Sequence, residues 1–214
     1  MSQPSRSYLP AAGFHWTLPL YDPLVKLLGG DAARAALLDQ AALRVNERVL
    51  DIGCGTGTLA MTIKRRYPQV EVTGLDPDPG ALRRAARKAQ RASLSIQLDR
   101  GFSDDLPYED ARFERVFSSF MLHHLDDKEA TLREVRRVLK PGGAFHMLDF
   151  ADPRSGGVHG RLSHLVHSSK RLKDNNEARM LELMRQAGLV SPMTVAERSL
   201  LVGHIAYYQA LAPS

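Results

Sequence analysis

Short apolar runs alternate with amphipathic stretches along most of this chain. The apolar runs, which predict buried strands, cover residues 48–52, 70–75, 94–98, 113–120 and 144–150. The amphipathic or alanine-rich stretches, which predict helices, cover residues 31–43, 58–67, 79–91, 128–139 and 177–187. Strands separated by helices form parallel sheets with right-handed connections, so we expect a doubly wound α/β fold.

Several helix boundaries have recognisable signals. Asp31 is the expected N-cap of the first helix, because a side-chain carboxylate there can accept from free backbone N–H groups. Tyr67 precedes Pro68, and the residue before a proline disfavours the helical conformation. Residues 141–143, Pro-Gly-Gly, are the expected stop after the helix over 128–139.

The last third of the chain departs from the alternation. Two apolar runs, 193–200 and 204–211, flank Gly203 and predict an antiparallel hairpin at the edge of the sheet. Before them, residues 151–174 are rich in glycine and basic residues, and we expect a mobile segment over the sheet. This segment contains His159, His164 and His167. We expect these histidines to be solvated or to line the substrate site rather than to bind a metal.

The length of 214 residues suits a single α/β domain. We divide it into an N-terminal flap and helix (1–45), a ligand-binding core (46–150), a lid segment (151–174) and a C-terminal helix with the edge hairpin (175–214).

The net charge of +5 is explained by the solvated faces of two arginine-rich helices, so we expect no nucleic-acid partner. Cys54 is the one cysteine, which excludes an internal disulfide. Without a secretory signal or a membrane-spanning apolar stretch in the sequence, we expect a cytoplasmic protein.

A glycine-rich turn gives the strongest chemical signal. Residues 49–57 read Val-Leu-Asp-Ile-Gly-Cys-Gly-Thr-Gly, so a strand that contains Asp51 runs into glycines and then a helix. Glycines allow the backbone to approach a ligand closely. Open parallel sheets bind ligands at the carboxyl ends of their strands, which is where this turn lies.

Charge distinguishes between two possible ligands of this turn. A dinucleotide site requires a third glycine where this chain has Thr58, and the carboxylate of Asp51 would repel a pyrophosphate. S-adenosylmethionine has a sulfonium and an ammonium against one carboxylate, and it suits an acid-lined pocket. Asp76 ends the second strand roughly 20 residues beyond the turn, the distance expected for an acid that accepts from ribose hydroxyls.

The run from Val49 to Phe150 resembles the class I S-adenosylmethionine-dependent methyltransferases. The resemblance is closest to the ubiquinone/menaquinone-biosynthesis enzymes and the small-molecule methyltransferases. The matching pieces are the glycine turn, Asp76, residues 106–108 (Leu-Pro-Tyr), residues 117–125 and residues 138–143 (Val-Leu-Lys-Pro-Gly-Gly). The resemblance implies a Rossmann-like, seven-stranded, mostly parallel sheet of order 3-2-1-4-5-7-6 with strand 7 antiparallel. It also implies S-adenosyl-L-methionine as cofactor, with S-adenosyl-L-homocysteine as product.

The resemblance also implies a set of cofactor contacts. The expected residues around the methionine half are Asp51, Gly53, Gly55, Thr56, Ser118 and Ser119. Asp76, followed by Pro77, is expected at the ribose. Apart from the resemblance, the N-terminal aromatic residues either form a flap over the cofactor or pack as ordinary apolar side chains; they are Tyr8, Phe14, Trp16 and Tyr21, and Tyr21 is the one expected to contact the ligand.

The expected adenine contacts depart from the family pattern. Many relatives have Gly-Asp-Ala where this chain has Gly101-Phe102-Ser103. Phe102 can pack on the adenine ring but cannot accept from its amino group. We therefore expect Asp104 or a backbone carbonyl to accept instead.

Methyl transfer from a sulfonium requires mainly a positioned acceptor and the exclusion of water. A general base is needed only where the attacking atom must lose a proton. His123 or His124, which follow the fourth strand, is the expected base; the alternative is that one of them packs against or caps the next helix. Cys54 is expected to fill space beneath the glycine turn rather than to act as a nucleophile.

The acceptor is only partly constrained. Residues 118–121 (Ser-Ser-Phe-Met) do not match the motif of enzymes that methylate exocyclic base amines. The segments 156–174 and 201–211 do not match the quinone enzymes. We expect transfer to an N, O or C atom of a small molecule. A nucleic-acid or protein methyltransferase, and a protein that binds the cofactor without catalysis, remain as alternatives.

Overall fold

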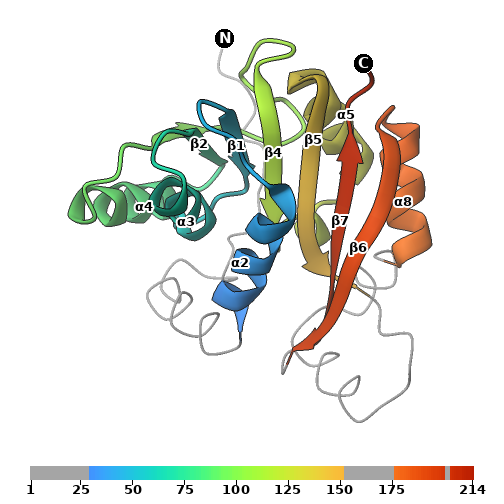
Figure 1. Cartoon of the computed structure of the whole chain (residues 1–214), viewed down its shortest axis with the longest axis horizontal. Coiled ribbons are helices and arrows are strands. Elements are labelled where there is room, and N and C mark those ends of the chain that lie inside the picture. Colours follow the sequence, from blue (N-terminus) through green and yellow to red (C-terminus); the bar gives the residue numbers. More distant parts are fainter. Residues whose placement is uncertain (1–28, 152–175, 201–202) are drawn as a thin grey trace.

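A computed structural model describes residues 29–151, 176–200 and 203–214 of the chain, which are coloured in Figure 1. Seven strands form one sheet in the order β3-β2-β1-β4-β5-β7-β6. The strands are β1 (Arg48–Ile52), β2 (Glu71–Asp76), β3 (Gln97–Arg100), β4 (Phe113–Ser119), β5 (Leu139–Phe150), β6 (Val190–Leu200) and β7 (Gly203–Leu211). The helices are α2 (Gly30–Ala41), α3 (Thr58–Arg66), α4 (Pro79–Arg91), α5 (Lys128–Val138) and α8 (Glu177–Gln186), with a 3-10 turn, η1 (Leu122–His124).

The sheet has the direction pattern that the sequence predicts. All neighbours from β3 to β5 pair in parallel, and β7 pairs antiparallel with both β5 and β6. In Figure 1 the arrows of β4 and β5 accordingly point down while that of β7 points up. The doubly wound fold, the strand order and the terminal hairpin are confirmed.

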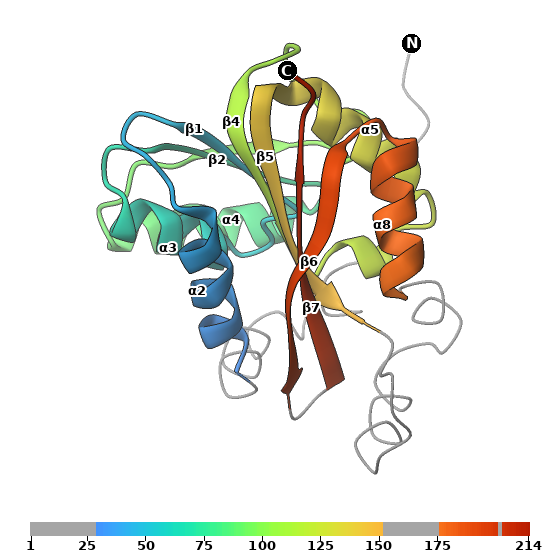
Figure 2. The ribbon, with the colours of Figure 1, turned by 45° about the vertical axis from the view of Figure 1, so that its right-hand side comes forward.

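Helices lie on both faces of the sheet, and Figure 2 separates them into two layers. One hydrophobic cluster joins α2 and α3 to the sheet through fully buried side chains such as Leu37, Ile63 and Phe117. A second cluster on the other face joins α5 and α8 to the sheet, with Val135 and Met184 fully buried. None of the helices in the described ranges combines the length and the hydrophobicity needed to cross a membrane.

The expected N-cap of α2 is wrong. The cap position is Gly29, which has a left-handed φ of 89° and makes no side-chain cap. Asp31 lies one residue inside the helix, where its carboxylate favours the positive N-terminal end and lies 3.8 Å from Arg34. Glycine adopts the left-handed turn without strain, so the chain reverses there and the helix begins one residue early.

Several strand boundaries differ from the expectation, and two of the differences have a clear physical reason. The third strand begins at Gln97 rather than at Leu94, because the Leu94 N–H still donates to Ala89 at the end of α4. β5 begins at Leu139, which pairs with Phe113, so Pro-Gly-Gly lies within the strand instead of ending the helix. The register then shifts between Phe113 and Arg115, an irregularity that accommodates the glycines.

Candidate cofactor and acceptor site

The glycine turn between β1 and α3 has the backbone shape that its sequence implies. The N–H groups of Gly53 and Cys54 both donate to the Leu75 carbonyl, at 2.8 and 3.0 Å, which ties the turn to the end of β2. Gly53, Gly55 and Gly57 all have positive φ. A side chain at Gly55 would meet nothing within 4 Å, whereas one at Gly53 would collide with Met121. The turn is therefore open at Gly55 and closed at Gly53.

Asp51 is a buried carboxylate beside the glycine turn. Its side chain is 1% exposed; Oδ2 accepts from the Ala60 N–H at 3.1 Å, and Oδ1 has no partner among the described residues. Burial raises the pKa of Asp51 to about 7, against the lowering effects of Arg34 and the Ala60 N–H, and the neighbouring charge of Asp76 adds to the rise. A positively charged ligand would stabilise the ionised form of this buried carboxylate, so the position favours a cationic ligand.

Arg34 is a site residue that the sequence reasoning missed. It lies on α2, is 8% exposed, and its Nε donates to the Ser119 hydroxyl at 3.3 Å. The guanidinium also lies 5.4 Å from the centre of the Phe120 ring. One feature of the sequence could have identified Arg34: it is a lone arginine on the apolar face of an alanine-rich helix, beside Leu37 and Leu38. A fixed cation at this position suits an anionic group of a ligand.

Asp76 lies at the end of β2, where the sequence placed it, and faces the glycine turn. Its Oδ2 accepts from the Gly55 N–H and its Oδ1 from the Asp78 N–H, both at 2.8 Å. Burial raises the pKa of Asp76, although both backbone bonds oppose the rise. Each carboxylate oxygen retains a second lone pair, which leaves capacity for a ligand diol. Pro77, the next residue, accepts from Arg100 Nε through its carbonyl at 3.3 Å.

The loop after β3 begins beside Asp76. The Gly101 N–H donates to the Asp76 carbonyl at 3.3 Å, so Phe102 and Ser103 start at the same edge of the sheet. The Ser103 hydroxyl lies 2.9 Å from that of Thr131 on α5 and is directed at the helix. Phe102 is half-buried and forms an isolated bridge with Asp105.

The remaining predicted contacts divide between the two faces of the sheet. Ser119 lies with Arg34, whereas strand alternation places Ser118 on the opposite face, 1% exposed and with a hydroxyl that has no partner in the described part of the chain. Thr56 is buried and accepts from Lys88 at 3.2 Å. Tyr21, the other N-terminal aromatic residues and the histidines of 151–174 lie outside the described residues.

His123 forms a buried pair with Asp149. After Arg34, Asp149 is the second site residue that the sequence analysis did not identify. The Nδ1 of His123 lies 2.5 Å from Asp149 Oδ1, and the backbone N–H of His123 donates to Oδ2 at 2.9 Å. Burial would raise the pKa of Asp149, but the charge and hydrogen bond of His123 and the N–H groups of His123 and Phe150 hold it below its ordinary value. The available signal was an acid near the end of an otherwise apolar strand, since residues 147–150 are Met-Leu-Asp-Phe.

Aromatic rings surround this pair. The ring of His124 lies 3.9 Å from that of His123, and Phe150 contacts His123 edge-on at 5.2 Å between centroids. Phe120 packs on Phe150, also at 5.2 Å, and holds a φ of 55° that a bulky side chain rarely adopts. Such strain is concentrated at functional sites. The half-buried rings of Phe120, His124 and Phe150 supply apolar surface beside the His123–Asp149 pair.

Cys54 has the filler position expected of it. It is 8% exposed, and its sulfur occupies the space that a side chain at Gly74 would need. Burial raises the pKa of its thiol, as do the nearby charges of Asp51 and Asp76. A buried neutral thiol is a poor nucleophile.

The methyltransferase domain family matches residues 49–143 of this chain. The chain is 40% identical over 141 residues to a demethylmenaquinone methyltransferase of Deinococcus radiodurans, which covers 64% of this chain and 58% of that protein. It is 38% identical over 141 residues to the enzyme of the same name from Thermus thermophilus, covering 64% of each chain. A norajmaline N-methyltransferase of Rauvolfia serpentina is 30% identical over 151 residues, covering 65% of this chain and 52% of that one. The chain thus spans less than two thirds of the length of these relatives.

Solved structures share the fold at low sequence identity. Phosphoethanolamine N-methyltransferase 2 of Haemonchus contortus, in complex with S-adenosyl-L-methionine, superposes with a TM-score of 0.81 at 15% identity. That match covers 98% of this chain and 61% of the other. The YcgJ protein of Bacillus subtilis superposes with a TM-score of 0.72 at 19% identity, covering 86% and 99%.

Proposed function

We propose that this chain, which belongs to the class I S-adenosylmethionine-dependent methyltransferases, transfers a methyl group from that cofactor to an N, O or C atom of a small molecule. The observation that carries the proposal is the buried Oδ1 of Asp51 at the open glycine turn, which has no hydrogen-bond partner within residues 29–151, 176–200 and 203–214 and has Arg34 close by. Family membership gives the reaction class, and the residues of this chain decide whether the cofactor fits.

The charges of the site fit the methionine half of the cofactor. This half has an ammonium and a sulfonium, which are positive, and one carboxylate. Asp51 offers a carboxylate oxygen without a partner in the described residues, and Arg34 offers a guanidinium on the same face of the sheet. Gly55 leaves open space where a Cβ would otherwise stand. The same arrangement opposes a pyrophosphate, because Asp51 would repel it.

The nucleoside half is assigned to the ends of β2 and β3. Asp76 retains acceptor capacity on both oxygens for the two ribose hydroxyls. Phe102 begins the loop beside Asp76 and supplies a ring for packing on adenine. The Ser103 hydroxyl is engaged with Thr131, so we expect a backbone group of this loop, or Asp104, to contact the adenine amino group.

His123 is the general base of the proposed reaction. Because the carboxylate of Asp149 only accepts, the proton on Nδ1 of His123 lies between them and Nε2 is the nitrogen that takes a proton from the acceptor. Asp149 holds the ring in this tautomer and stabilises the positive charge that develops on it. The cofactor, when bound, supplies an electrophilic methyl group that needs no further activation.

The base favours acceptors that must lose a proton: a hydroxyl, a protonated amine or an acidic carbon. The aromatic surface of Phe120, Phe150 and His124 beside it suits a planar acceptor. Relatives are named as C-methyltransferases and as N-methyltransferases, so their names do not select the attacked atom. Because these relatives are named for small molecules, we propose a small-molecule acceptor. We also propose a cytoplasmic protein without a nucleic-acid partner.

Calorimetric titration with S-adenosylhomocysteine tests cofactor binding. We expect micromolar affinity for the intact chain and a loss of about 100-fold in Asp76→Ala, which removes two charged acceptors. Glu182→Ala is the matched control, because this carboxylate is 48% exposed on α8, which packs on the opposite face of the sheet from the helix that follows the glycine turn. Binding of NADH in place of the sulfur ligand would refute the cofactor assignment.

Formation of S-adenosylhomocysteine with a panel of phenols, hydroquinones and amines tests the base. In His123→Asn and Asp149→Asn we expect kcat to fall by roughly 100-fold or more with the cofactor Kd unchanged. A chain that binds the cofactor and turns over none of the panel would instead support the non-catalytic alternative.

A further inference from the structure

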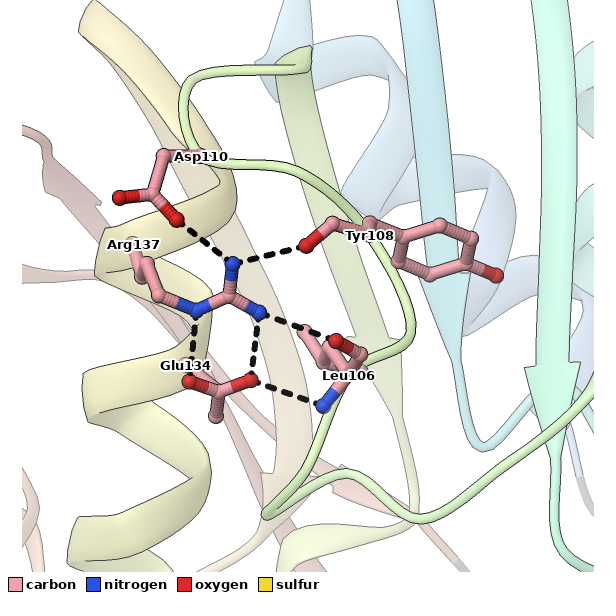
Figure 3. Close-up of polar contacts among 5 residues, drawn as sticks. All are labelled: Leu106, Tyr108, Asp110, Glu134 and Arg137. Carbon is pink, nitrogen blue, oxygen red and sulfur yellow. Dashed lines mark hydrogen bonds and ion pairs between the residues drawn. The ribbon is translucent and has the colours of Figure 1, made fainter.

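The loop between β3 and β4, residues 101–112, has little regular structure of its own. One isolated bridge, Phe102 to Asp105, is the only strand-like pairing in it. Its conformation is instead held by α5, which lies against it in Figure 3. The apolar side of α5 is used elsewhere, since Leu132, Val135 and Val138 are fully buried in the core.

Arg137 of α5 divides its side-chain donors between this loop and Glu134 of the same helix, as Figure 3 shows. Nη1 donates to the Tyr108 carbonyl and to Asp110, both at 2.7 Å, and Nη2 donates to the Leu106 carbonyl at 3.0 Å. Nε and Nη2 donate to the two oxygens of Glu134 at 2.8 and 2.7 Å. A guanidinium has five N–H groups, and each one is used here.

Glu134 completes the connection from the same helix. Its Oε2 accepts from the Leu106 N–H at 2.8 Å, so Glu134 and Arg137 together bind both backbone groups of Leu106. The hydrogen bond from Arg137 lowers the pKa of Glu134, with burial opposing and the Leu106 N–H assisting. Three positions of α5, each three residues apart, therefore contact the loop: Thr131 at Ser103, then Glu134, then Arg137.

The loop is also fixed from the sheet. The Tyr108 hydroxyl donates to Asp99 Oδ2 on β3 at 3.0 Å, and the Tyr108 side chain is 7% exposed. At its start the loop is joined to the ribose side of the site by the Gly101 N–H on the Asp76 carbonyl. The segment that begins with Phe102 is thus held at both ends, and Arg137 holds the end farther from the ligand.

We infer that Arg137, held in place by Glu134, is a positioning residue for base recognition: it fixes the loop whose first residues form the adenine side of the cofactor site. This inference rests on the proposed function. Arg137 itself does not reach the site, because its donors are all spent on the loop and on Glu134. Its contribution is to limit the positions that Phe102 and the neighbouring carbonyls adopt.

Arg137→Lys is the sharpest variant, because it keeps the charge and reduces five planar donors to three. Arg133→Lys is the matched control on the same helix: Arg133 is 59% exposed and its partner in the described residues is Glu129, at 3.7 Å. Glu134→Gln is a second test, since it keeps the shape and weakens the hold on both Leu106 and Arg137. Thermal melts without ligand select an assay temperature at which each variant is folded.

The readout compares two ligands that differ in the base: S-adenosylhomocysteine and S-inosylhomocysteine, in which an oxygen replaces the amino group. In Arg137→Lys we expect S-adenosylhomocysteine to bind about tenfold more weakly. The preference for it over the inosine ligand should shrink, while Arg133→Lys leaves both values unchanged. With a saturating cofactor, kcat should stay close to that of the intact chain while the cofactor KM rises.

Two results would overturn the inference. One is an affinity for S-adenosylhomocysteine in Arg137→Lys within twofold of the intact chain. The other is an equal weakening of both ligands, which would mean that Arg137 supports the fold and not base recognition. Failure of the intact chain to bind S-adenosylhomocysteine at all would instead refute the proposed function, so the two failures are distinguishable.

Discussion

Asp51→Asn should make the ligand-free protein more stable, although it removes a site residue. Asparagine has the same shape and can still accept from the Ala60 N–H, but it has no charge to bury. In the native protein the pKa of Asp51 is about 7, because burial opposes ionisation, compared with 3.8 for an ordinary aspartate. Ionised Asp51 is therefore a source of instability that the substitution removes.

The sign and size follow from proton linkage. Between pH 3.8 and pH 7 the folded state keeps the Asp51 proton and the unfolded state does not, so the stability due to this group falls as the pH rises. At 1.36 kcal/mol for each unit of pKa shift, the raised pKa of Asp51 lowers the free energy of unfolding by about 4 kcal/mol at pH 8 and by about 2 kcal/mol at pH 5, relative to a group with an unshifted pKa. For a chain of this length, 4 kcal/mol corresponds to about 10 °C in Tm.

Thermal or urea unfolding of the ligand-free protein at pH 5 and pH 8 measures both values. We expect Asp51→Asn to gain more stability at pH 8 than at pH 5. Asp149→Asn is the matched control with the opposite sign, because the pKa of Asp149 is lowered and its ionised form stabilises the fold at neutral pH. An Asp51→Asn protein that is less stable than the native chain at pH 8, or a gain that does not change with pH, would refute the reasoning.

Further predictions concern the same turn. Affinity for S-adenosylmethionine should rise about tenfold from pH 6 to pH 8, as measured by calorimetry, because a cationic ligand binds the ionised form of Asp51, whose pKa is about 7. Gly53→Ala should lower the free energy of unfolding by about 2 kcal/mol or more, because its Cβ would stand 2.3 Å from Met121 Cγ at a φ of 67°. Gly55→Ala should lose only about 1 kcal/mol in a denaturant melt, since its Cβ meets nothing within 4 Å, but should weaken cofactor binding by filling the open turn.

The sheet was predictable because its strands are signalled locally. Val49, Leu50 and Ile52 are fully buried, and apolar residues on both faces are what a parallel central strand requires, so β1 has the predicted bounds. Boundaries failed where tertiary pairing decides them. Leu139 becomes a strand residue because Phe113 lies beside it, a contact between residues 26 apart that no local pattern records.

Contacts in the candidate site were predictable where one short motif contains both residues. They were not predictable where the two residues lie on elements that are far apart in the sequence. The glycine turn and Asp76 are separated by one βα unit, so their spacing predicts the contact between Gly55 and Asp76. Arg34 reaches Ser119 across 85 positions of the sequence, and His123 meets Asp149 across 26. Periodicity assigns residues to faces of helices and strands, but it does not say which two polar side chains on different elements come together.

Two of the buried acids at the ligand edge of the sheet, Asp51 and Asp149, show which charges the site contains and which it lacks. Asp51 and Asp149 are each 1% exposed, and burial acts on both in the same direction. Asp149 has a cation-forming partner from the chain itself, His123 at 2.5 Å, and its pKa is lowered. Asp51 has Arg34 only as a weaker neighbour, keeps one oxygen without a partner among the described residues, and has a raised pKa. The charge of Asp149 is therefore balanced by a proton that remains in the protein on His123. The charge of Asp51 is balanced only when a positively charged ligand binds.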